Sequence, residues 1–395
     1  MLFWDVVFYI SIFIVLYNYL LYAVIAFLIN NIILKNYKSK SRDYYPTISF
    51  IVAAYNEQDI IEKKIENSLQ QDYPLSKIEL IFITDGSTDS TPAIITNYPQ
   101  IKLLHEATRA GKSAALNRAV LAAKNDILII SDANTFLNNQ AVKLIARHYE
   151  DGLVGGVAGE KRVIQSPEDT DNVGSREGLY WKYESLLKRI DSDFYSVVGA
   201  AGELFSVRRK LYEVLPDTTI LDDFVISLKA AEKGFRIIYE PDAYAVEFAS
   251  ISVADEKKRK VRISAGGFQS MQMLASLFKF WRHPRLTFLY ISHRVLRWTL
   301  SPLCLILIFF SNIILAFGTH NLFYTIILAA QIVFYTTAFL SSFIPKNSKL
   351  KFLKFTGYFV FMNVSVIQGF FRFLFGKQAS AWEKVNRSSA SITAD

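Results

Sequence analysis

The feature that most constrains this fold is the division between apolar ends and a charged middle. Residues 6–34 form an apolar run whose only strongly polar side chains are asparagines. Two further apolar runs, 300–317 and 322–344, are joined by the short turn 318–321. Each run is close to or longer than the roughly 20 residues that a helix needs to cross a bilayer. We predict an N-terminal transmembrane anchor and a C-terminal helical hairpin around a central domain.

Charge beside the first run predicts which way the chain is inserted. Lys35, Lys38, Lys40 and Arg42 follow it directly, and the positive-inside rule then places the central domain in the cytoplasm. No basic residue precedes the run, which favours an uncleaved anchor over a signal peptide. We expect a multi-pass protein of the cell (inner) membrane. The predicted divisions are an anchor (1–34), a central domain (35–277), an interfacial helix (278–299), transmembrane helices (300–375) and a tail (376–395).

Two of these segments allow alternatives. The apolar run 355–375 contains Asn363, Gln368 and Arg372, so it either spans or is partly re-entrant, and the side of the tail stays open. Residues 278–298 mix aromatic side chains with lysine and arginine, which is typical of a helix in the headgroup layer. A cytoplasmic extension of the following span is the alternative.

Composition excludes several classes of protein. Cys304 is the one cysteine and lies in an apolar run, which rules out a disulfide framework and a thiolate metal site. The net charge of +8 fits a protein beside anionic lipid. The aromatic residues gather in the apolar runs and do not interleave with a basic stripe, so we predict no nucleic-acid partner.

Strand and helix patterns alternate in the first part of the central domain. Short runs rich in β-branched residues predict strands at 47–54, 79–84, 101–105 and 126–131, with helices at 57–71, 91–98 and 111–123 between them. This alternation predicts a doubly wound α/β sheet. Ligands of such sheets bind at the carboxyl ends of the strands, where Asn56, Asp85 and Asp132 fall.

The pattern becomes less regular after about residue 150. Helices are predicted at 177–189 and 223–233, and a strand at 236–239. The polar motifs are weak signals when taken singly. Asp132-Ala133-Asn134 supplies the oxygen ligands that a hard divalent cation prefers, but an ordinary turn has the same composition.

Taken in order along the chain, the motifs are specific. Ala54-Tyr55-Asn56-Glu57, Asp85, Asp132-Ala133-Asn134, Asp222-Asp223 and Arg259 with Arg262 resemble the membrane-bound family 2 glycosyltransferases of the GT-A fold. That group includes hyaluronan, cellulose and poly-N-acetylglucosamine synthases. The resemblance covers residues 45–300 and the flanking spans. It implies an inverting hexosyltransferase that uses a UDP-sugar or another nucleotide-sugar with Mg²⁺ or Mn²⁺.

The resemblance also implies roles for individual residues. Asp223 would be the catalytic base, and Arg262 would offset the charge of the departing diphosphate. Asp132 and Asn134 would hold the metal. The small-residue loop Gly199-Ala-Ala-Gly202 and Asp222 would contact the acceptor. The residues expected to bind the nucleotide-sugar are Ala54, Tyr55, Asn56, Glu57, Asp85, Lys112, Asp132 and Arg259.

Three residues depart from the family pattern. Asn134 replaces a second metal-binding aspartate, and Arg259 replaces a glutamine. Ile263 stands where the polymerising members have a tryptophan that stacks on a sugar. The acceptor is therefore either a glycan that is polymerised or a lipid-linked acceptor that receives a single sugar.

Two non-enzymatic classes compete with this interpretation. A membrane-anchored sugar-nucleotide-binding or scaffold subunit of an exopolysaccharide assembly would be expected to lack a catalytic position, and none is missing. A transporter is less favoured, because the first two clear spans carry no ionisable residue deep in their middle.

Overall fold

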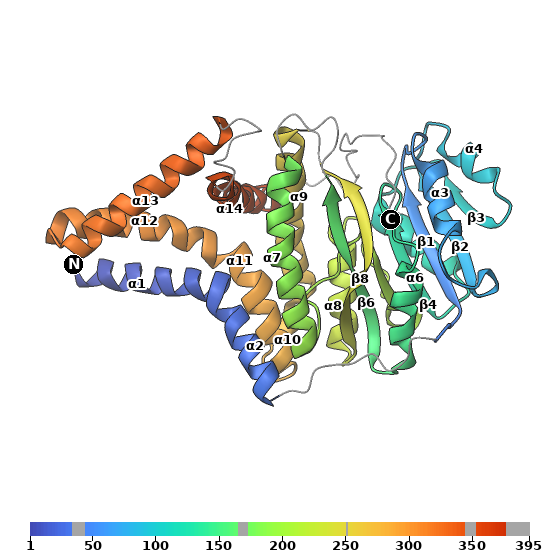
Figure 1. Cartoon of the computed structure of the whole chain (residues 1–395), viewed down its shortest axis with the longest axis horizontal. Helices are drawn as coiled ribbons and strands as arrows, with labels where there is room; N and C mark the ends of the chain where they lie inside the picture. The colour runs from blue at the N-terminus through green and yellow to red at the C-terminus, as the bar shows by residue number, and fades with distance from the viewer. Residues whose placement is uncertain (34–43, 165–172, 250–251, 344–352, 377–395) are drawn as a thin grey trace.

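The computed structural model describes residues 1–33, 44–164, 173–249, 252–343 and 353–376. Within those residues, eight strands form one mixed sheet in the order β3-β2-β1-β4-β7-β6-β8-β5 (Figure 1). The strands are β1 (Ile48–Ala54), β2 (Ile78–Asp85), β3 (Ile101–Glu106), β4 (Ile127–Asp132), β5 (Phe136–Leu137), β6 (Val154–Ile164), β7 (Phe205–Arg208) and β8 (Arg236–Phe248).

In the parallel half of the sheet, β2, β1 and β4 are buried on both faces, whereas the edge strand β3 is partly exposed. Ile51 and Ala53 of β1 belong to one core with α5, and Phe50 and Val52 belong to a second core with α3 and α6. Helices on both faces explain why these strands are continuous apolar runs rather than alternating ones. The covering helices are α3 (Ile61–Leu69), α4 (Thr91–Thr96), α5 (Lys112–Ala122) and α6 (Ala141–Ala146).

The ends of the parallel strands lie in register. Ala54 of β1 is opposite Thr84 of β2, and Ala53 of β1 is opposite Asp132 of β4. The segments that follow β1, β2 and β4 therefore begin at one edge of the sheet. This confirms the α/β fold expected from the sequence and brings three of the predicted polar positions to that edge.

The second half of the sheet is more regular than the sequence indicated. β7 runs antiparallel between β4 and β6, and β8 runs parallel to β6. The strand predicted at 236–239 continues to Phe248, because a register irregularity between Gly159 and Glu160 of β6 accommodates the three residues 241–243 of β8. Three helices complete this half: α7 (Val173–Phe194), α8 (Asp222–Glu232) and α9 (Val253–Met273).

The N-terminal helix is longer than a bilayer requires. It consists of α1 (Leu2–Leu16), the π-helical turn η1 (Tyr17–Leu21) and α2 (Tyr22–Ile33). Its apolar 31 residues would extend about 46 Å, against roughly 30 Å of hydrocarbon. The α2 part packs beside α7, and Tyr22 and Ala26 are fully buried in the same core as the sheet. The predicted anchor is thus partly a component of the central domain.

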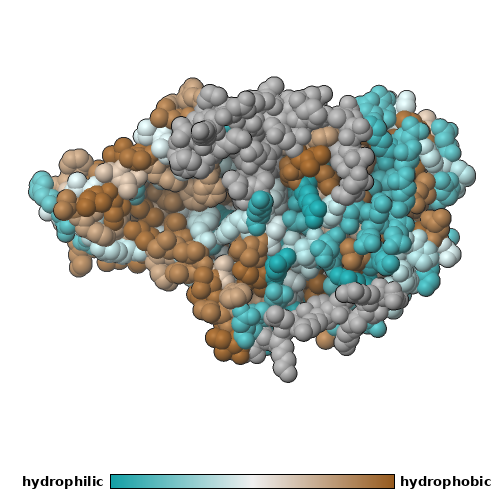
Figure 2. Space-filling model, viewed as in Figure 1, coloured by the Kyte–Doolittle hydropathy of each residue, from teal (hydrophilic) through white to brown (hydrophobic). Residues whose placement is uncertain are grey.

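Four helices are long and apolar enough to cross a membrane, among the described residues and by length and composition alone. Besides the N-terminal helix they are α12 (Leu300–Thr319), α13 (Leu322–Leu340) and α14 (Leu353–Leu374), so the run 355–375 also meets this criterion. Apolar side chains such as Phe13, Phe310 and Phe339 are exposed on these helices. The end of the molecule that α1, α12 and α13 form in Figure 1 is largely hydrophobic at its surface (Figure 2). The basic residues 35–42, most of the basic loop 346–354 and the tail from 377 lie outside the described residues.

The predicted interfacial segment is folded against the central domain. It contains α10 (Pro284–Tyr290), the π-helical turn η6 (Ile291–Val295) and α11 (Leu296–Trp298). Tyr290, Arg297 and Trp298 are buried within the protein, whereas Trp281 is 78% exposed. Tyr290 and Trp298 pack against Phe224 of α8, and Arg294 and Arg297 pair with Glu184 of α7. The first part of the segment, with Lys279, Arg282 and Arg285, is exposed.

Candidate active site

A cavity of about 630 Å³ lies at the carboxyl edge of the sheet and extends toward α14 and the N-terminal helix. Eleven of the residues predicted from the sequence line it: Tyr55, Glu57, Lys112, Asp132, Asn134, Gly199, Gly202, Asp222, Asp223, Arg259 and Arg262. Ala54 and Asp85 line a small adjoining pocket, together with Tyr55 and Lys112. Asn56 lines neither of them. The structure thus brings together residues that are more than 200 positions apart in the chain.

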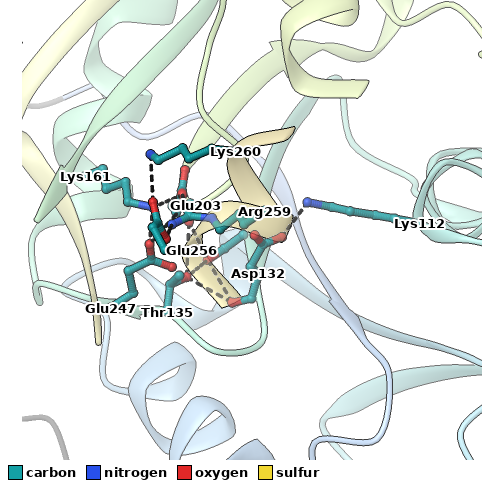
Figure 3. Close-up of polar contacts among 10 residues, drawn as sticks. Lys112, Asp132, Thr135, Lys161, Glu203, Glu247, Glu256, Arg259 and Lys260 are labelled. Atoms are coloured by element: carbon teal, nitrogen blue, oxygen red, sulfur yellow. Dashed lines mark hydrogen bonds and ion pairs between the residues drawn. The ribbon is translucent and has the colours of Figure 1, made fainter. Parts of the chain in front are cut away.

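Asp132 is held at the end of β4 by two lysines. The buried Lys64 of α3 donates to Ser131 Oγ (2.8 Å) and to the carbonyl of Thr135 (2.7 Å), which supports the turn that carries Asp132 and Asn134. Lys112, at the first position of α5, pairs with Asp132 Oδ1 at 2.5 Å (Figure 3). Burial raises the pKa of Asp132, and the charge of Lys112 opposes that rise.

The Asp132 turn can accommodate a divalent cation. Asn134 Oδ1 is buried and has no hydrogen-bond partner among the described residues, so it is available as a ligand beside Asp132. No cluster of three or more His, Cys, Asp or Glu side chains that could hold a metal occurs in the described part of the chain. Magnesium bound to a substrate diphosphate takes only one or two ligands from protein, which matches this pair.

Asp222 and Asp223 occupy the first turn of α8. Gly202 packs against this turn: a Cβ there would lie 3.0 Å from Lys112 Nζ and 3.4 Å from Asp223 Oδ2. Lys112 therefore lies between the carboxylates of Asp132 and Asp223. Burial, together with the negative charge of Asp222, raises the pKa of Asp223 to about 7. A carboxylate of this kind can accept a proton near neutral pH.

The carboxylates around Lys112 determine the direction in which its pKa shifts. Burial alone would lower the pKa of Lys112, but Asp132, Asp222 and Asp223 outweigh it and raise that pKa. Lys112 is thus a permanent positive charge at the centre of the acidic cluster. It reduces the repulsion that would otherwise oppose three carboxylates in one cavity.

The two arginines of α9 have different surroundings. Arg259 lies 3.5 Å from Glu247 and 3.4 Å from Glu256, so its guanidinium is committed to an acidic cluster. No salt bridge of Arg262 is found among the described residues, and its nearest opposite charges are those of Asp222 and Asp132. Burial, followed by the charge of Arg259, lowers the pKa of Arg262. Arg262 is the α9 arginine placed to meet a new anion.

Sequence reasoning did not find the cluster around Arg259. Lys161 of β6 pairs with Glu203 and Glu247, and Lys260 lies 3.1 Å from Glu256 (Figure 3). Only Glu203 had a local signal, since it directly follows the Gly199–Gly202 loop. The others come from β6, β8 and α9, which no motif connects. The cluster fixes the start of α9, and so the direction of Arg262.

The small adjoining pocket is largely filled by the chain itself. Asp85 pairs with Arg118 at 2.8 Å and accepts from the backbone N–H groups of Ala110 and Gly111 at 2.9 Å and 2.6 Å. The Arg109 guanidinium lies 3.7 Å from the centroid of the Tyr55 ring. Asp85 therefore anchors the loop before α5 in this structure.

Asn56 has a structural task in the loop after β1. It adopts a left-handed backbone conformation (φ 53°), which asparagine tolerates better than most residues. Its Oδ1 accepts from the backbone N–H of Thr88 at 2.8 Å. Asn56 thus ties the loop after β1 to the loop after β2, which shapes the rim of the small pocket.

Comparison with known proteins defines the class of this enzyme. Residues 49–215 match the family described as Glycosyl transferase family 2. Together with the GT-A architecture, this match identifies a family 2 glycosyltransferase domain, in a chain whose described residues include four candidate membrane-spanning helices.

Individual relatives refine the picture. A poly-beta-1,6-N-acetyl-D-glucosamine synthase of Staphylococcus aureus (strain MSSA476) is 27% identical over 230 residues, which are 56% of this chain and 55% of that protein. The Staphylococcus epidermidis synthase is 25% identical over 232 residues, with the same coverage. The chain thus aligns with about half the length of these curated relatives.

A solved structure shares the fold over nearly the whole chain. The mannosyltransferase PcManGT from Pyrobaculum calidifontis, in complex with GDP-Man and Mn²⁺, has a TM-score of 0.70 and 22% identity. The alignment covers 94% of this chain and 99% of that one. At this identity the likeness establishes the architecture, including its membrane-length helices, and leaves the substrate open.

Proposed function

We propose that this enzyme transfers a sugar from a nucleotide-diphospho-sugar, a UDP-sugar in the first instance, to a glycan or lipid-linked acceptor with inversion at the anomeric carbon. The observation that carries the proposal is the placement of Asp132 and Asp223 in one cavity, with Lys112 between them. The curated relatives named as polysaccharide synthases support a role in polysaccharide biosynthesis. A nucleotide-sugar donor is supported by the GDP-Man complex of the structural neighbour.

The geometry suggests the order of events at Asp223. Its carboxylate removes the proton of an acceptor hydroxyl while that oxygen attacks the anomeric carbon. The new oxygen–carbon bond forms as the bond from that carbon to the diphosphate oxygen breaks, which inverts the configuration. With a pKa of about 7, Asp223 is a strong enough base to assist and is substantially ionised at neutral pH.

The departing nucleotide diphosphate carries the charge that the site must offset. Arg262 and Lys112 are fixed cations that face this region, and preorganised charges of this kind stabilise a transition state without reorganising. Mg²⁺ or Mn²⁺ on Asp132 and Asn134 would supply further positive charge to the diphosphate. The ion pairs around Arg259 hold α9 in place, so that Arg262 can pair with the diphosphate.

The candidate spans support a reaction beside a lipid surface. α14 packs against α9, and a Cβ at Gly369 of α14 would lie 2.5 Å from Ser264 of α9. The helix that carries Arg262 is therefore in direct contact with a candidate span. We propose that the site faces the cytoplasm at the inner membrane, as the basic residues after the first helix predict.

A donor screen tests the proposal. Purified full-length protein is incubated with a panel of UDP- and GDP-sugars and Mg²⁺ or Mn²⁺, nucleotide release is measured, and labelled product is sized. Asp132→Asn should lower nucleotide release by about a hundredfold or more, as losses of one charged transition-state contact do. The control Asp126→Asn changes a side chain that is 93% exposed and should leave the rate unchanged. An Asp132→Asn protein as fast as its parent would refute the proposal.

A further inference from the structure

The part of the cavity beyond Asp223 has an unusual wall. It is built from two helices that are each long enough to cross a membrane, the N-terminal helix and α14. The side chains that these helices contribute are mostly apolar: Val15, Leu16, Leu20, Phe355, Phe359, Met362 and Val366. A site for sugars alone has little use for such a surface, because it cannot satisfy their hydroxyl groups.

The polar groups in this wall are largely occupied with one another. The Tyr19 hydroxyl donates to Asn363 Oδ1 at 3.2 Å, and Asn363 Nδ2 donates to the carbonyl of Phe359 at 2.9 Å. A glycan passing along the wall would have to compete with these bonds. A hydrocarbon chain would leave them intact.

A group of cations lies beside the apolar wall and also lines the cavity. Arg294 and Arg297, from η6 and α11, both pair with Glu184 of α7, with Arg294 Nη1 at 3.0 Å. These arginines hold the pKa of Glu184 well below its usual range despite its burial, so Glu184 is ionised. One carboxylate thus faces two guanidinium groups. The neighbouring Asp191 is already bonded to His293 and to the Tyr22 hydroxyl.

Lys188 adds a third cation one turn further along α7. Its side chain lines the cavity and is 2% exposed, yet its Nζ has no hydrogen-bond partner among the described residues. The ammonium lies 5.5 Å from the Trp181 ring and 5.7 Å from the Tyr239 ring. The Glu160 carboxylate, whose charge acts most strongly on Lys188, accepts from the hydroxyls of Ser185 and Tyr239 and has no hydrogen bond to Lys188 Nζ. Burial lowers the pKa of Lys188, which a bound anion would reverse.

We propose that this cavity binds an acceptor in which an apolar hydrocarbon chain is joined to a phosphate. The chain lies against the N-terminal helix and α14, and the phosphate lies against Arg294, Arg297 and Lys188. A sugar attached to that phosphate then presents its hydroxyl to Asp223. The argument is geometric: the Lys188 ammonium is buried at the cavity wall without a hydrogen-bond partner among the described residues, and a charge buried in this way is costly unless an anion joins it.

The proposal rests on the glycosyl transfer proposed above and selects one of its two acceptor classes. It also accounts for Ile263. A lipid-phosphate acceptor is held by its chain and its charge, so it does not need the aromatic platform on which a growing polymer stacks.

Binding of defined probes tests the proposal. Full-length protein in phosphatidylcholine nanodiscs is titrated with farnesyl phosphate, with farnesol and with inorganic phosphate, and empty nanodiscs are subtracted. Farnesyl phosphate should bind at least about tenfold more tightly than either of the other two, because only it engages both halves of the site. Equal affinity for farnesyl phosphate and farnesol would overturn the phosphate assignment.

Two matched pairs of variants locate the binding. Lys188→Met should weaken the binding of farnesyl phosphate by about tenfold and leave the binding of farnesol unchanged. Its control, Lys182→Met, changes an exposed lysine of the same helix and should affect the binding of neither lipid. Met362→Trp should weaken both lipids by filling the apolar part of the cavity. The control Val364→Trp alters a residue of α14 that is 42% exposed and does not line the cavity. Lipid binding that is unchanged in Lys188→Met and Met362→Trp would refute the proposed site.

Nucleotide release separates this inference from the function on which it rests. Nucleotide release that depends on Asp132, without specific binding of farnesyl phosphate, would refute the lipid-phosphate acceptor and support the glycosyltransferase mechanism. Specific binding of farnesyl phosphate by a protein whose donor turnover does not depend on Asp132 would support the lipid-phosphate site and refute the proposed mechanism of transfer.

Discussion

The pH dependence of donor turnover is the sharpest consequence of the site geometry. The ordinary pKa of an aspartate is 3.8, and burial with the charge of Asp222 raises that of Asp223 to about 7. Only the ionised form can accept the proton of the acceptor. The ionised fraction of such a group rises from about one tenth at pH 6 to about nine tenths at pH 8, and kcat/KM should rise close to tenfold with it.

Two variants isolate the cause of this profile. Asp223→Asn should abolish most of the turnover at every pH, because an amide cannot act as the base. Asp222→Asn should retain turnover but move the midpoint of the profile to lower pH, because it removes the negative charge that helps to raise the pKa of Asp223. The assay is nucleotide release over about pH 5.5 to pH 9 with saturating divalent cation.

The stability of the folded protein should fall as pH rises, whereas the turnover rate should increase. A carboxyl group whose pKa is higher in the folded state binds its proton more tightly there, so ionisation destabilises the fold as pH rises from about 4 to about 7. Above that range the penalty is constant, and below it there is none. Asp223→Asn should therefore raise the Tm at pH 8 and have little effect at pH 4. A flat rate profile in the parent, or a Tm at pH 8 that falls on substitution, would refute the assignment of Asp223 as a buried base.

Three further predictions concern the shape of the site. Asn134→Asp places a second carboxylate beside Asp132 and should lower the Mn²⁺ concentration for half-maximal activity several-fold; an unchanged metal dependence would exclude Asn134 as a ligand. Gly199→Ala should destabilise the protein by about 2–4 kcal/mol in thermal unfolding, because residue 199 has φ 86° and a Cβ there would lie 2.0 Å from Phe224. Gly234→Ala, with φ 90° but nothing within 4 Å, is its control and should cost about 1–2 kcal/mol. Lys64→Met removes the two hydrogen bonds that support the Asp132 turn, so it should weaken the binding of both the metal and the donor. Nucleotide release measured against Mn²⁺ concentration and against donor concentration checks both effects.

The elements that could be predicted are those with a local signal. The strands β1, β2, β3 and β4 are apolar runs bounded by turn residues, and their pattern alone indicates the parallel half of the sheet. The residues at the ends of these strands were found for the same reason, since parallel strands bring their carboxyl ends to one edge. The apolar helices were found because a long apolar run has few alternatives.

The ion-pair clusters that no sequence motif indicates depend on contacts between distant segments of the chain. Lys161, Glu247 and Lys260 carry no motif, and only the pairing of β6 with β8 and the position of α9 make them one cluster. The pattern of Arg294 and Arg297 predicts a surface feature, because a sequence does not show that Glu184 lies opposite them. Arg259, which is predicted to bind the nucleotide-sugar, lines the cavity, and its guanidinium also pairs with Glu247 of β8 and with Glu256 of its own helix.

Sequence alone therefore determined the class of fold, the residue types at the strand ends and the helices suited to a membrane, because each depends on a pattern within a short stretch of chain. The tertiary structure decided which charges meet. Ion pairing depends on a few ångströms between side chains that can be a hundred residues apart, and no periodicity in the sequence encodes that distance. For the same reason, the apolar wall of the cavity and its cations could be recognised only in the folded protein.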